Sequence, residues 1–411
     1  MEFREISKDE FKKFSDKHAL SSFIQTVNMG NYQESLGNQV YYLGAFDNDK
    51  NLKAATLIFG IKARLGYYYN APRGYLIDFE DKELLKFFND NVVNFLKHKQ
   101  GYILKIEPKI LYQEHDINGD VVEGGFNNQH IVNNIIDLGF IHNGFYKELD
   151  LNKQVRWSSV LNFNGLDEKQ IFKNFKGNTR NLIRKAIKHG VKVVELEYDD
   201  LIEFKKVVDS TGLRKNFTSR PLKYYQDMYK YFHDDGYVKF LAAKINLNEH
   251  LNILYQEKED LIKHLNKLSD NKANDGKRKE IDEAMKGLNK KINYANEILK
   301  EDGENILLAG GMFMTYGNET VYLYSGSYDK YMNFYGQYLI QWEIIKYGIN
   351  NGFKAHNFYG ISGDFSKENK RHGVYEFKKS FNGIVNEYIG DFDYILNPTM
   401  YKIKKIFKRH E

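Results

Sequence analysis

The hydrophobic pattern of the N-terminal part of the chain alternates between strand and helix periodicity. Short runs rich in aromatic and β-branched residues are bounded by Asn, Asp, Gly or Pro, which is typical of β-strands. Between them lie longer segments with Leu, Phe, Val and Ile at helical spacing. The pattern predicts strands over 40–46, 54–61 and 101–107, and helices over 81–97 and 128–138.

A second alternating stretch begins at Trp157 and has the same texture. Its first helical segment carries a clear stop signal, Gly190, directly after its last residue. The pattern predicts strands over 157–163, 191–195, 237–245, 305–316, 319–325 and 355–358, and helices over 167–189, 199–212 and 335–347.

The segment between Leu247 and Leu299 interrupts this second stretch. It contains no proline and is dense in Lys, Glu, Asp and Asn. Two rows of mostly apolar residues, which we call seams, repeat at alternating steps of four and three residues. One seam runs through Leu247, Leu251, Leu254, Lys258, Leu261, Leu265 and Leu268, and the other through Ile281, Met285, Leu288, Ile292, Ala295 and Leu299. Seams this narrow are typical of coiled coils. We therefore predict an antiparallel helical hairpin with its tip near 269–277, because two separate surface helices would leave both seams exposed.

The order of these elements predicts an α/β (α+β) fold with two α/β units in tandem and the hairpin inserted into the second. The expected boundaries are 1–150 for the first unit, 151–245 and 304–395 for the second, 246–303 for the coiled-coil arm, and 396–411 for a basic C-terminal helix.

The composition is that of a soluble globular protein of 411 residues that has no cysteine. The missing cysteines exclude disulfides, thiolate metal ligands and a cysteine nucleophile, and they favour a cytoplasmic protein. No apolar run approaches the roughly 18 residues of a membrane span, and the N-terminus lacks a signal-peptide core. Lys and Arg exceed Asp and Glu by 60 to 55. This mild excess permits a polyanionic partner but does not require one.

Standard catalytic motifs are absent from the sequence. There is no G-x-S-x-G elbow, Walker A loop, G-x-G-x-x-G fingerprint or H-E-x-x-H motif. The acyl-CoA loop typical of N-acetyltransferases, Q/R-x-x-G-x-G/A, is also missing. The 12 histidines do not fall at metal-ligand spacing, so we predict no metal site.

The predicted helix over 167–189 carries a row of basic residues without an acidic neighbour one turn away. The row consists of Lys173, Lys176, Arg180, Arg184 and Lys188, of which the last three share one helix face. A basic stripe of this kind is what binding to a phosphate backbone requires, and these residues are candidates for binding RNA. A solvated helix face is the alternative interpretation.

Two further segments carry candidate chemistry. Arg220 precedes Pro221 at a predicted helix start, and Tyr224 follows one turn later, so that both side chains can converge on a phosphate. A surface arginine stacked over a tyrosine would give the same pattern.

Phe377 and Lys378 lie in an alternation of aromatic and cationic residues after the NFYGISGDF block. A lysine held against aromatic rings can stabilise a developing oxyanion, whereas an edge strand with outward lysines is the alternative.

Taken in order, these blocks resemble the FemA/FemB family of non-ribosomal peptidyltransferases over nearly the whole chain. The resemblance rests on SSFIQTVNMGNY (21–32), PRGYLIDF (72–79), LKIEP (104–108), the basic helix, the arm, and the C-terminal block that includes NFYGISGDF, FKKSFN and IGDFDYILNP. It implies two fused acetyltransferase (GNAT)-like subdomains with a coiled-coil arm.

The resemblance also implies an activity and its partners. Family members transfer an amino acid, usually glycine and in relatives serine or alanine, from aminoacyl-tRNA to an amine of a peptidoglycan precursor. The acceptor is the stem lysine of lipid II or the end of a growing bridge. Because the tRNA ester is already activated, no cofactor is expected. DNA is not an expected partner, while a related transferase or a second copy is. The cationic, amphipathic tail YKIKKIFKRH (401–410) would suit the inner face of the plasma membrane.

By the same resemblance, Arg220, Tyr224 and Tyr324 match acceptor-binding residues, and Lys378 after Phe377 matches the lysine near the acyl-transfer centre. Gln33 and Glu107 also match acceptor-binding positions. Gln33 stands where relatives carry a basic residue, and Glu107 stands where they carry the aspartate of an I-D-P run. These two departures indicate a different acceptor or donor preference.

Two other functions remain open on the sequence alone. One is an acyl-CoA-dependent N-acetyltransferase with a tandem fold, and the other is a catalytically inactive relative that binds tRNA or the precursor.

Overall fold

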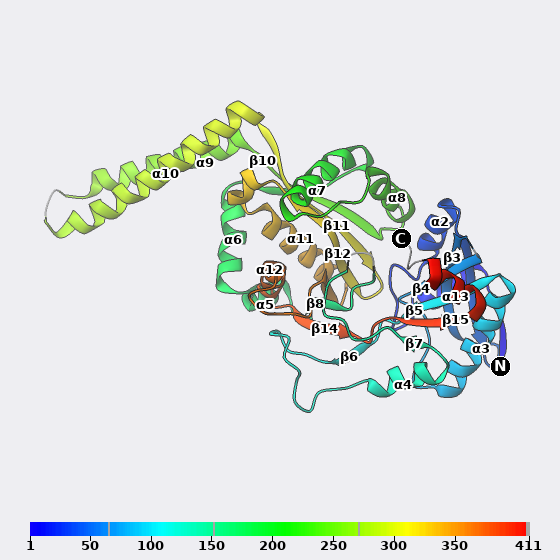
Figure 1. Ribbon diagram of the computed structural model, residues 1–411. Coiled ribbons are helices and arrows are strands. Elements are labelled where there is room, and N and C mark those ends of the chain that lie inside the picture. The colour runs from blue at the N-terminus through cyan, green and yellow to red at the C-terminus, as the bar shows by residue number, and fades with distance from the viewer. Residues whose placement is uncertain (65, 151–152, 270–271, 408–411) are drawn as a thin grey trace.

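The computed structural model describes residues 1–64, 66–150, 153–269 and 272–407, and it contains two β-sheets packed side by side with a long helical arm (Figure 1). The first sheet has the order β1-β2-β3-β4-β5-β15-β7. Its strands are β1 (Glu2–Glu5), β2 (Gln39–Phe46), β3 (Leu52–Ala63), β4 (Gly66–Pro72), β5 (Gly101–Glu107), β15 (Phe392–Ile395) and β7 (Ile141–His142).

The second sheet has the order β6-β14-β8-β13-β12-β11-β10-β9. Its strands are β6 (Leu111–Glu114), β14 (Ile384–Tyr388), β8 (Trp157–Asn162), β13 (Ala355–Gly360), β12 (Glu319–Ser327), β11 (Asn305–Tyr316), β10 (Val238–Asn246) and β9 (Lys192–Glu195).

The two sheets share the same strand topology. In the first, antiparallel strands β2, β3 and β4 are followed by helix α3 (Lys82–His98), and β5 then pairs parallel to β4. In the second, antiparallel β10, β11 and β12 are followed by helix α11 (Gly336–Asn350), and β13 pairs parallel to β12. A parallel pair needs such a crossover connection. The predicted fold of two α/β units with an inserted hairpin is confirmed.

The expected boundary at residue 150 does not separate the two sheets, because each unit contributes one strand to the sheet of the other unit. β6 belongs to the second sheet although it precedes residue 150, and β15 belongs to the first although it follows β14. Buried ion pairs accompany both exchanges. Glu387 of β14 pairs with Arg156 and with His115 next to β6, and Lys105 of β5 pairs with Asp391 next to β15.

The other α-helices cover these sheets and fill the space between them. They are α1 (Lys8–Ser15), α2 (Val27–Ser35), α4 (Gln129–Asp137), α5 (Glu168–Asn174), α6 (Gly177–Lys188), α7 (Leu201–Lys215), α8 (Leu222–Phe232), α12 (His372–Lys379) and α13 (Pro398–Phe407). One core cluster contains Phe11 and Met29 of the first unit together with Phe204, Tyr225 and Met228 of the second. The hydrophobic core is therefore continuous across the seam between the units.

The single helix predicted over 167–189 is wrong, because the chain breaks it into α5 and α6. Phe175 and Lys176 are extended, and the backbone N–H of Lys176 donates to the carbonyl of Ser380, which follows α12. Phe175 is buried at this break. A tertiary contact therefore replaces the helical hydrogen bond that the sequence pattern favours.

The inserted arm consists of α9 (Leu247–Lys267) and α10 (Asp275–Asp302), which lie antiparallel and project from the body (Figure 1). Its base is the β10–β11 ladder, which ends at the pair Asn246↔Asn305. The two predicted seams face each other, with Leu251, Leu254, Leu288, Ile292 and Ala295 buried between the helices. The arm is thus an extended hairpin connection between two antiparallel strands.

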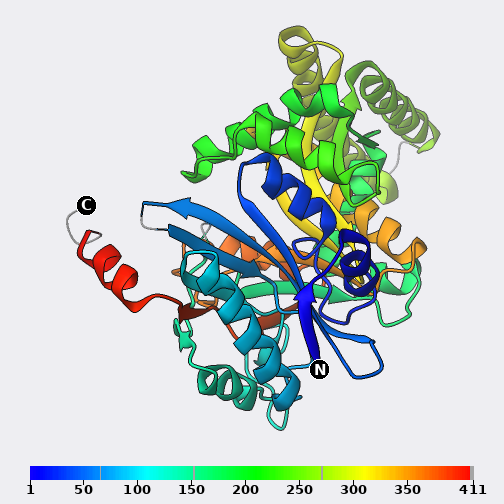
Figure 2. The same ribbon diagram turned by 90° about the vertical axis from the view of Figure 1, so that its right-hand side faces the viewer.

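The C-terminal segment forms helix α13, which lies beside the start of β4, where Met400 approaches Gly66 (Figure 2). Residues 408–411 of the predicted basic helix lie outside the described residues. Within the described part of the chain, no helix is both long enough and apolar enough to cross a membrane.

The architecture predicts that the body folds without the outer arm. Replacing residues 258–286 by a short Gly/Asn turn removes the distal half and keeps the buried contacts of Leu251 and Leu254. We expect the midpoint of thermal unfolding to change by only a few degrees, measured by circular dichroism. A loss of cooperative unfolding would show that the outer arm supports the body.

Candidate functional site

The candidate site lies where the parallel strands of the second sheet separate. β12 and β13 pair only from Glu319↔Ala355 to Val321↔Asn357, and β12 then continues beside β11 alone. In the first sheet, the parallel pair β4–β5 ends at Pro72↔Glu107. Ligands commonly bind beyond the carboxyl ends of parallel strands, where backbone groups and side chains are free to face a cleft.

Three predicted acceptor-binding residues meet at this opening. The Arg220 Nε donates to the hydroxyl of Tyr324 at 3.3 Å, and its guanidinium lies 5.7 Å from the ring centroid of Tyr224. The rings of Tyr224 and Tyr324 pack edge to face at 5.6 Å. Burial, followed by the neighbouring Tyr324, raises the pKa of Tyr224 well above its ordinary value, so this phenol stays protonated as a donor. We call Arg220, Tyr224 and Tyr324 the anion trio.

The first unit contributes Tyr32 to the same place. Its ring, on α2, packs against Tyr224 edge to face at 6.3 Å. The neighbouring Gln33, predicted to bind the acceptor, has its amide engaged locally, because its oxygen accepts from Asn38 at 2.7 Å and its nitrogen contacts Met29. The structure thus brings α2 to the trio through Tyr32.

A small cavity lies on the seam between the two units, with residues of both units in its lining. Its volume is about 10 Å³, and its polar lining includes Arg73, Lys109, Glu319, Asn357 and Tyr359. We call it the seam cavity. Burial raises the pKa of Tyr359, Arg73 acts to lower it, and the hydroxyl of Tyr324 acts to raise it, so Tyr359 lies within electrostatic reach of the trio.

Glu319 is the fixed negative charge of the seam cavity. Its carboxylate accepts from Lys109 Nζ at 2.5 Å and from Asn357 Nδ2 at 2.9 Å. Burial acts to raise the pKa of Glu319, but Lys109 and Asn357 outweigh it, so the pKa lies below its ordinary value. The same ammonium donates to the carbonyl of Ser21 at 2.9 Å. Lys109 therefore ties the first unit to β12 of the second.

Glu107, a predicted acceptor-binding residue, lies near this cavity rather than at the trio. It ends β5 and is 5% exposed, and its carboxylate accepts one long hydrogen bond, 3.4 Å, from the backbone of Gln154. Burial raises the pKa of Glu107, although Arg73 and Lys105 act in the opposite direction. A buried, weakly bonded carboxyl of this kind can accept a proton at a higher pH than an exposed one.

The predicted catalytic pair on α12 separates into two environments. Lys378 is 6% exposed and its ammonium donates to the carbonyls of Tyr359 at 3.2 Å and Gly360 at 2.6 Å. Burial lowers the pKa of Lys378 to about 7. The ring of Phe377 instead packs against Tyr338 and Phe381 in the core of the second unit. Lys378 therefore supports the end of β13, where Tyr359 has a left-handed φ of 63°. These residues form a helix, so the edge-strand alternative is wrong.

The basic residues expected to bind tRNA already make contacts within the protein. Lys176 pairs with Glu376 at 3.1 Å and Lys188 with Glu257 at 3.0 Å, both distant in sequence. Arg180 donates to the carbonyl of Lys173, and Arg184 lies over the ring of Phe172. Lys173, Lys176, Arg184 and Lys188 are exposed, so the surface of α5 and α6 remains basic.

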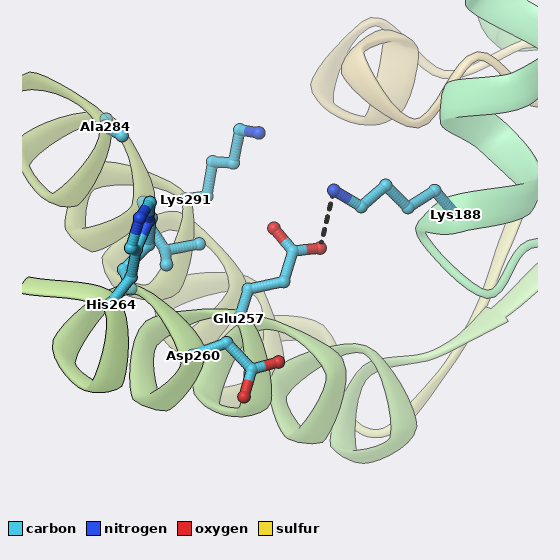
Figure 3. Close-up of a pocket in the computed structure, with 9 residues that line it drawn as sticks. Lys188, Glu257, Asp260, His264, Ala284 and Lys291 are labelled. Carbon is cyan, nitrogen blue, oxygen red and sulfur yellow. Dashed lines mark ion pairs between the residues drawn. The ribbon is translucent and has the colours of Figure 1, made fainter. Parts of the chain in front are cut away.

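A second, larger hollow of about 540 Å³ lies on the arm, and none of the trio residues lines it (Figure 3). Lys188 of α6 points toward Glu257 of α9 across its edge, and the small residues Ala284 and Gly287 leave the space open. Its lining comes mainly from the two arm helices, whereas the seam cavity joins both units. Among the described residues, no cluster of His, Asp and Glu could hold a metal ion.

Several residues of the site escaped the sequence analysis. Arg73, Lys109, Glu319 and Tyr359 lie in segments whose pattern indicates only strand ends and turns. The available signals were weak ones: Arg73 falls between a proline and a glycine, and Glu319 follows a Gly-Asn turn.

The pairing of Lys109 with Glu319 predicts a large effect on stability. Lys109→Met leaves a buried carboxylate without its counter-ion, which we expect to destabilise the fold by about 3 kcal/mol. The double variant Lys109→Met/Glu319→Gln should recover part of this loss in chemical unfolding. Lys86→Met, which breaks an exposed pair with Asp90, is the matched control and should change little. Equal effects of the two single variants would contradict the assignment.

Lys378 predicts a pH dependence of stability. Its folded pKa of about 7 lies well below the ordinary value of a lysine, so the unfolded chain binds more protons between pH 7 and 10. Stability of the wild type should therefore rise over this range relative to Lys378→Met, by up to about 1 kcal/mol per pH unit. The measurement is chemical unfolding at a series of pH values. Lys379→Met should keep the wild-type slope, and a wild type without the slope would refute the prediction.

Comparisons with known proteins agree with this architecture. The chain matches the FemAB family over residues 6–409. It is 31% identical to aminoacyltransferase FemA of Staphylococcus epidermidis over 417 residues, which covers 100% of this chain and 99% of that protein. FemA of Staphylococcus aureus is also 31% identical over 417 residues, with the same coverage.

The crystal structure of FemX shares the fold, with a TM-score of 0.78 and 23% identity over 98% of this chain and 99% of that chain. Since the family match and the FemA alignments both span essentially the whole chain, the chain belongs to the FemAB family and is an enzyme of the aminoacyltransferase class.

Proposed function

We propose that the protein transfers an amino acid from aminoacyl-tRNA to an amine of a peptidoglycan precursor. Glycine is the first candidate for the amino acid, with serine and alanine as alternatives. The acceptor is the stem lysine of lipid II or the end of a growing interpeptide bridge. The observation that carries the proposal is the anion trio at the opening between β12 and β13, in a chain that aligns over its whole length with aminoacyltransferases FemA.

The trio suits a phosphate of the acceptor. Arg220 is exposed and has no carboxylate within ion-pair distance among the described residues, so its guanidinium is available to an anion. The hydroxyl of Tyr224, held protonated by burial, is a further donor. A guanidinium and phenol donors together match the oxygens of a pyrophosphate-linked precursor.

The basic surface of α5 and α6 is our proposed contact for the tRNA donor. α6 carries Arg180, Arg184, Lys185 and Lys188 and no acidic residue. Binding of a phosphate backbone depends on such uncompensated positive charge and weakens with added salt. The break between α5 and α6 moves Lys173 and Lys176 off this helix, and they extend the basic surface toward α12.

The reaction requires few catalytic groups from the protein. The acceptor nitrogen attacks the ester carbonyl, an amide bond forms, and the ester oxygen leaves as the terminal hydroxyl of the tRNA. The nitrogen loses a proton, which the leaving hydroxyl takes up directly or through the substrate. Lys378 uses two of its three N–H groups on the carbonyls of β13, so we assign it the positioning of Tyr359 and a stabilising positive charge near the oxyanion.

We also propose that the protein works at the inner face of the plasma membrane. The tail over 401–410 is rich in lysine and alternates with isoleucine and phenylalanine, and α13 spans most of it. A cationic amphipathic helix binds anionic lipid surfaces, which would place the cleft near a lipid-linked acceptor.

Transfer assays test the proposal directly. The protein is incubated with bare or partly bridged lipid II and with separately charged Gly-, Ser- and Ala-tRNA, and the products are weighed by mass spectrometry. We expect addition of one or more residues from one tRNA and none from acyl-CoA. Product from acyl-CoA, or no product from any charged tRNA, would contradict the proposal.

In the same assay, Arg220→Gln should raise the KM for the acceptor by about tenfold or more. Arg214→Gln, which removes a nearby guanidinium paired with Asp329, is the control and should leave KM unchanged.

A further inference from the structure

Arg73 occupies an unusual position on the seam. It directly follows β4, and its backbone has a left-handed φ of 58°, a region that residues other than glycine rarely adopt. Its side chain reaches across to the second unit, where Nη2 donates to the carbonyl of Val155 at 2.8 Å and the guanidinium lies 4.2 Å above the ring of Tyr388. Strained backbone of this kind persists where the surroundings hold it, often at binding sites.

Arg73 is buried without a counter-ion. It is only 5% exposed, and among the described residues its guanidinium contacts a carbonyl and an aromatic ring, with no carboxylate within ion-pair distance. Buried charges in proteins are as a rule paired, because an unpaired ion in the interior is costly. One carbonyl and one aromatic face do not replace a carboxylate. The arrangement therefore lacks an anion.

The neighbouring acids do not supply that anion. Glu319 faces the same cavity, and Arg73 contributes to lowering its pKa, but Lys109 and Asn357 already occupy its carboxylate. Glu107 lies close enough for Arg73 to act on its pKa, yet burial dominates and raises that pKa. The seam cavity thus presents the cation of Arg73 beside an internally neutralised Lys109–Glu319 pair.

We propose that Arg73 binds a carboxylate of the acceptor's stem peptide in the seam cavity, an inference that rests on the proposed function. A guanidinium matches a carboxylate with two parallel hydrogen bonds. The cavity has a volume of about 10 Å³, which is room for about one water-sized group, so the end of a carboxylate can reach Arg73 there and a phosphate is too large. Tyr359 lines the cavity and lies near Tyr324 of the trio, so one extended acceptor can reach both sites.

A stem peptide offers two carboxylates, one at its C-terminus and one within the chain, and the test distinguishes them. The probe is a muramyl pentapeptide diphosphate with a stem lysine, made soluble by a short chain in place of the lipid. Four versions are compared, with neither, either or both carboxylates converted to amides. Binding is measured by titration calorimetry with the full-length protein and no tRNA, so the result does not depend on transfer.

We expect the wild type to bind the free peptide at least tenfold more tightly than the version amidated at the recognised position. Arg73→Gln should remove this difference and bind the amide as the wild type does. Arg73→Lys, which keeps the charge and loses the paired geometry, should keep part of it. The wild-type comparison stands even if Arg73→Gln does not fold, which circular dichroism would reveal.

Equal binding of all four versions to the wild type would overturn the role of Arg73 and leave the proposed acceptor intact. Discrimination that survives in a folded Arg73→Gln would also overturn it. If the wild type bound none of the four, the proposed acceptor itself would be wrong, and this inference with it.

Discussion

The partly buried contact between Lys109 and Glu319 is the interaction on which the site depends. Each group alone would be costly in the interior, and together they are stable because Asn357 and the carbonyl of Ser21 satisfy their remaining hydrogen bonds. Lys109 follows the parallel pair of the first sheet, and Glu319 begins the parallel pair of the second. The contact therefore fixes the carboxyl end of β4 and β5 against the opening between β12 and β13.

The repeated strand path explains why such a cleft exists. In both sheets a helix returns the chain to a parallel neighbour, and the strands of that pair end or part at the same edge. Tyr359 and Gly360 lie at that edge in the second sheet, and Lys378 binds their carbonyls from α12. The first sheet supplies Arg73 and Glu107 at its corresponding edge. The two units thus contribute different chemistry from equivalent positions.

Sequence reasoning succeeded where the physical cause is local. The arm follows from heptad seams, and the pairing of Arg220 with Tyr224 follows from one helical turn. It did not find the partners of Lys109 and Lys176, which lie 210 and 200 residues away, because ion pairs over such separations leave no periodic signal. The break between α5 and α6 has the same origin, since it depends on the carbonyl of Ser380. Tyr324 was found only through the family resemblance, because an isolated tyrosine in a strand carries no signal of its own.

The charges of the arm bear on where a tRNA would lie. α10 carries seven Asp or Glu and seven Lys or Arg, and α9 carries four acidic against three basic residues. Phosphate binding needs an excess of positive charge, and the arm has none. α6, in contrast, has four basic residues and no acidic one, and at its C-terminal end Lys188 pairs with Glu257 of the arm. That ion pair uses one of the four basic residues to hold the arm's base. We therefore expect the donor to be held by the body beside α6, and the arm to have its balanced surface available for another partner.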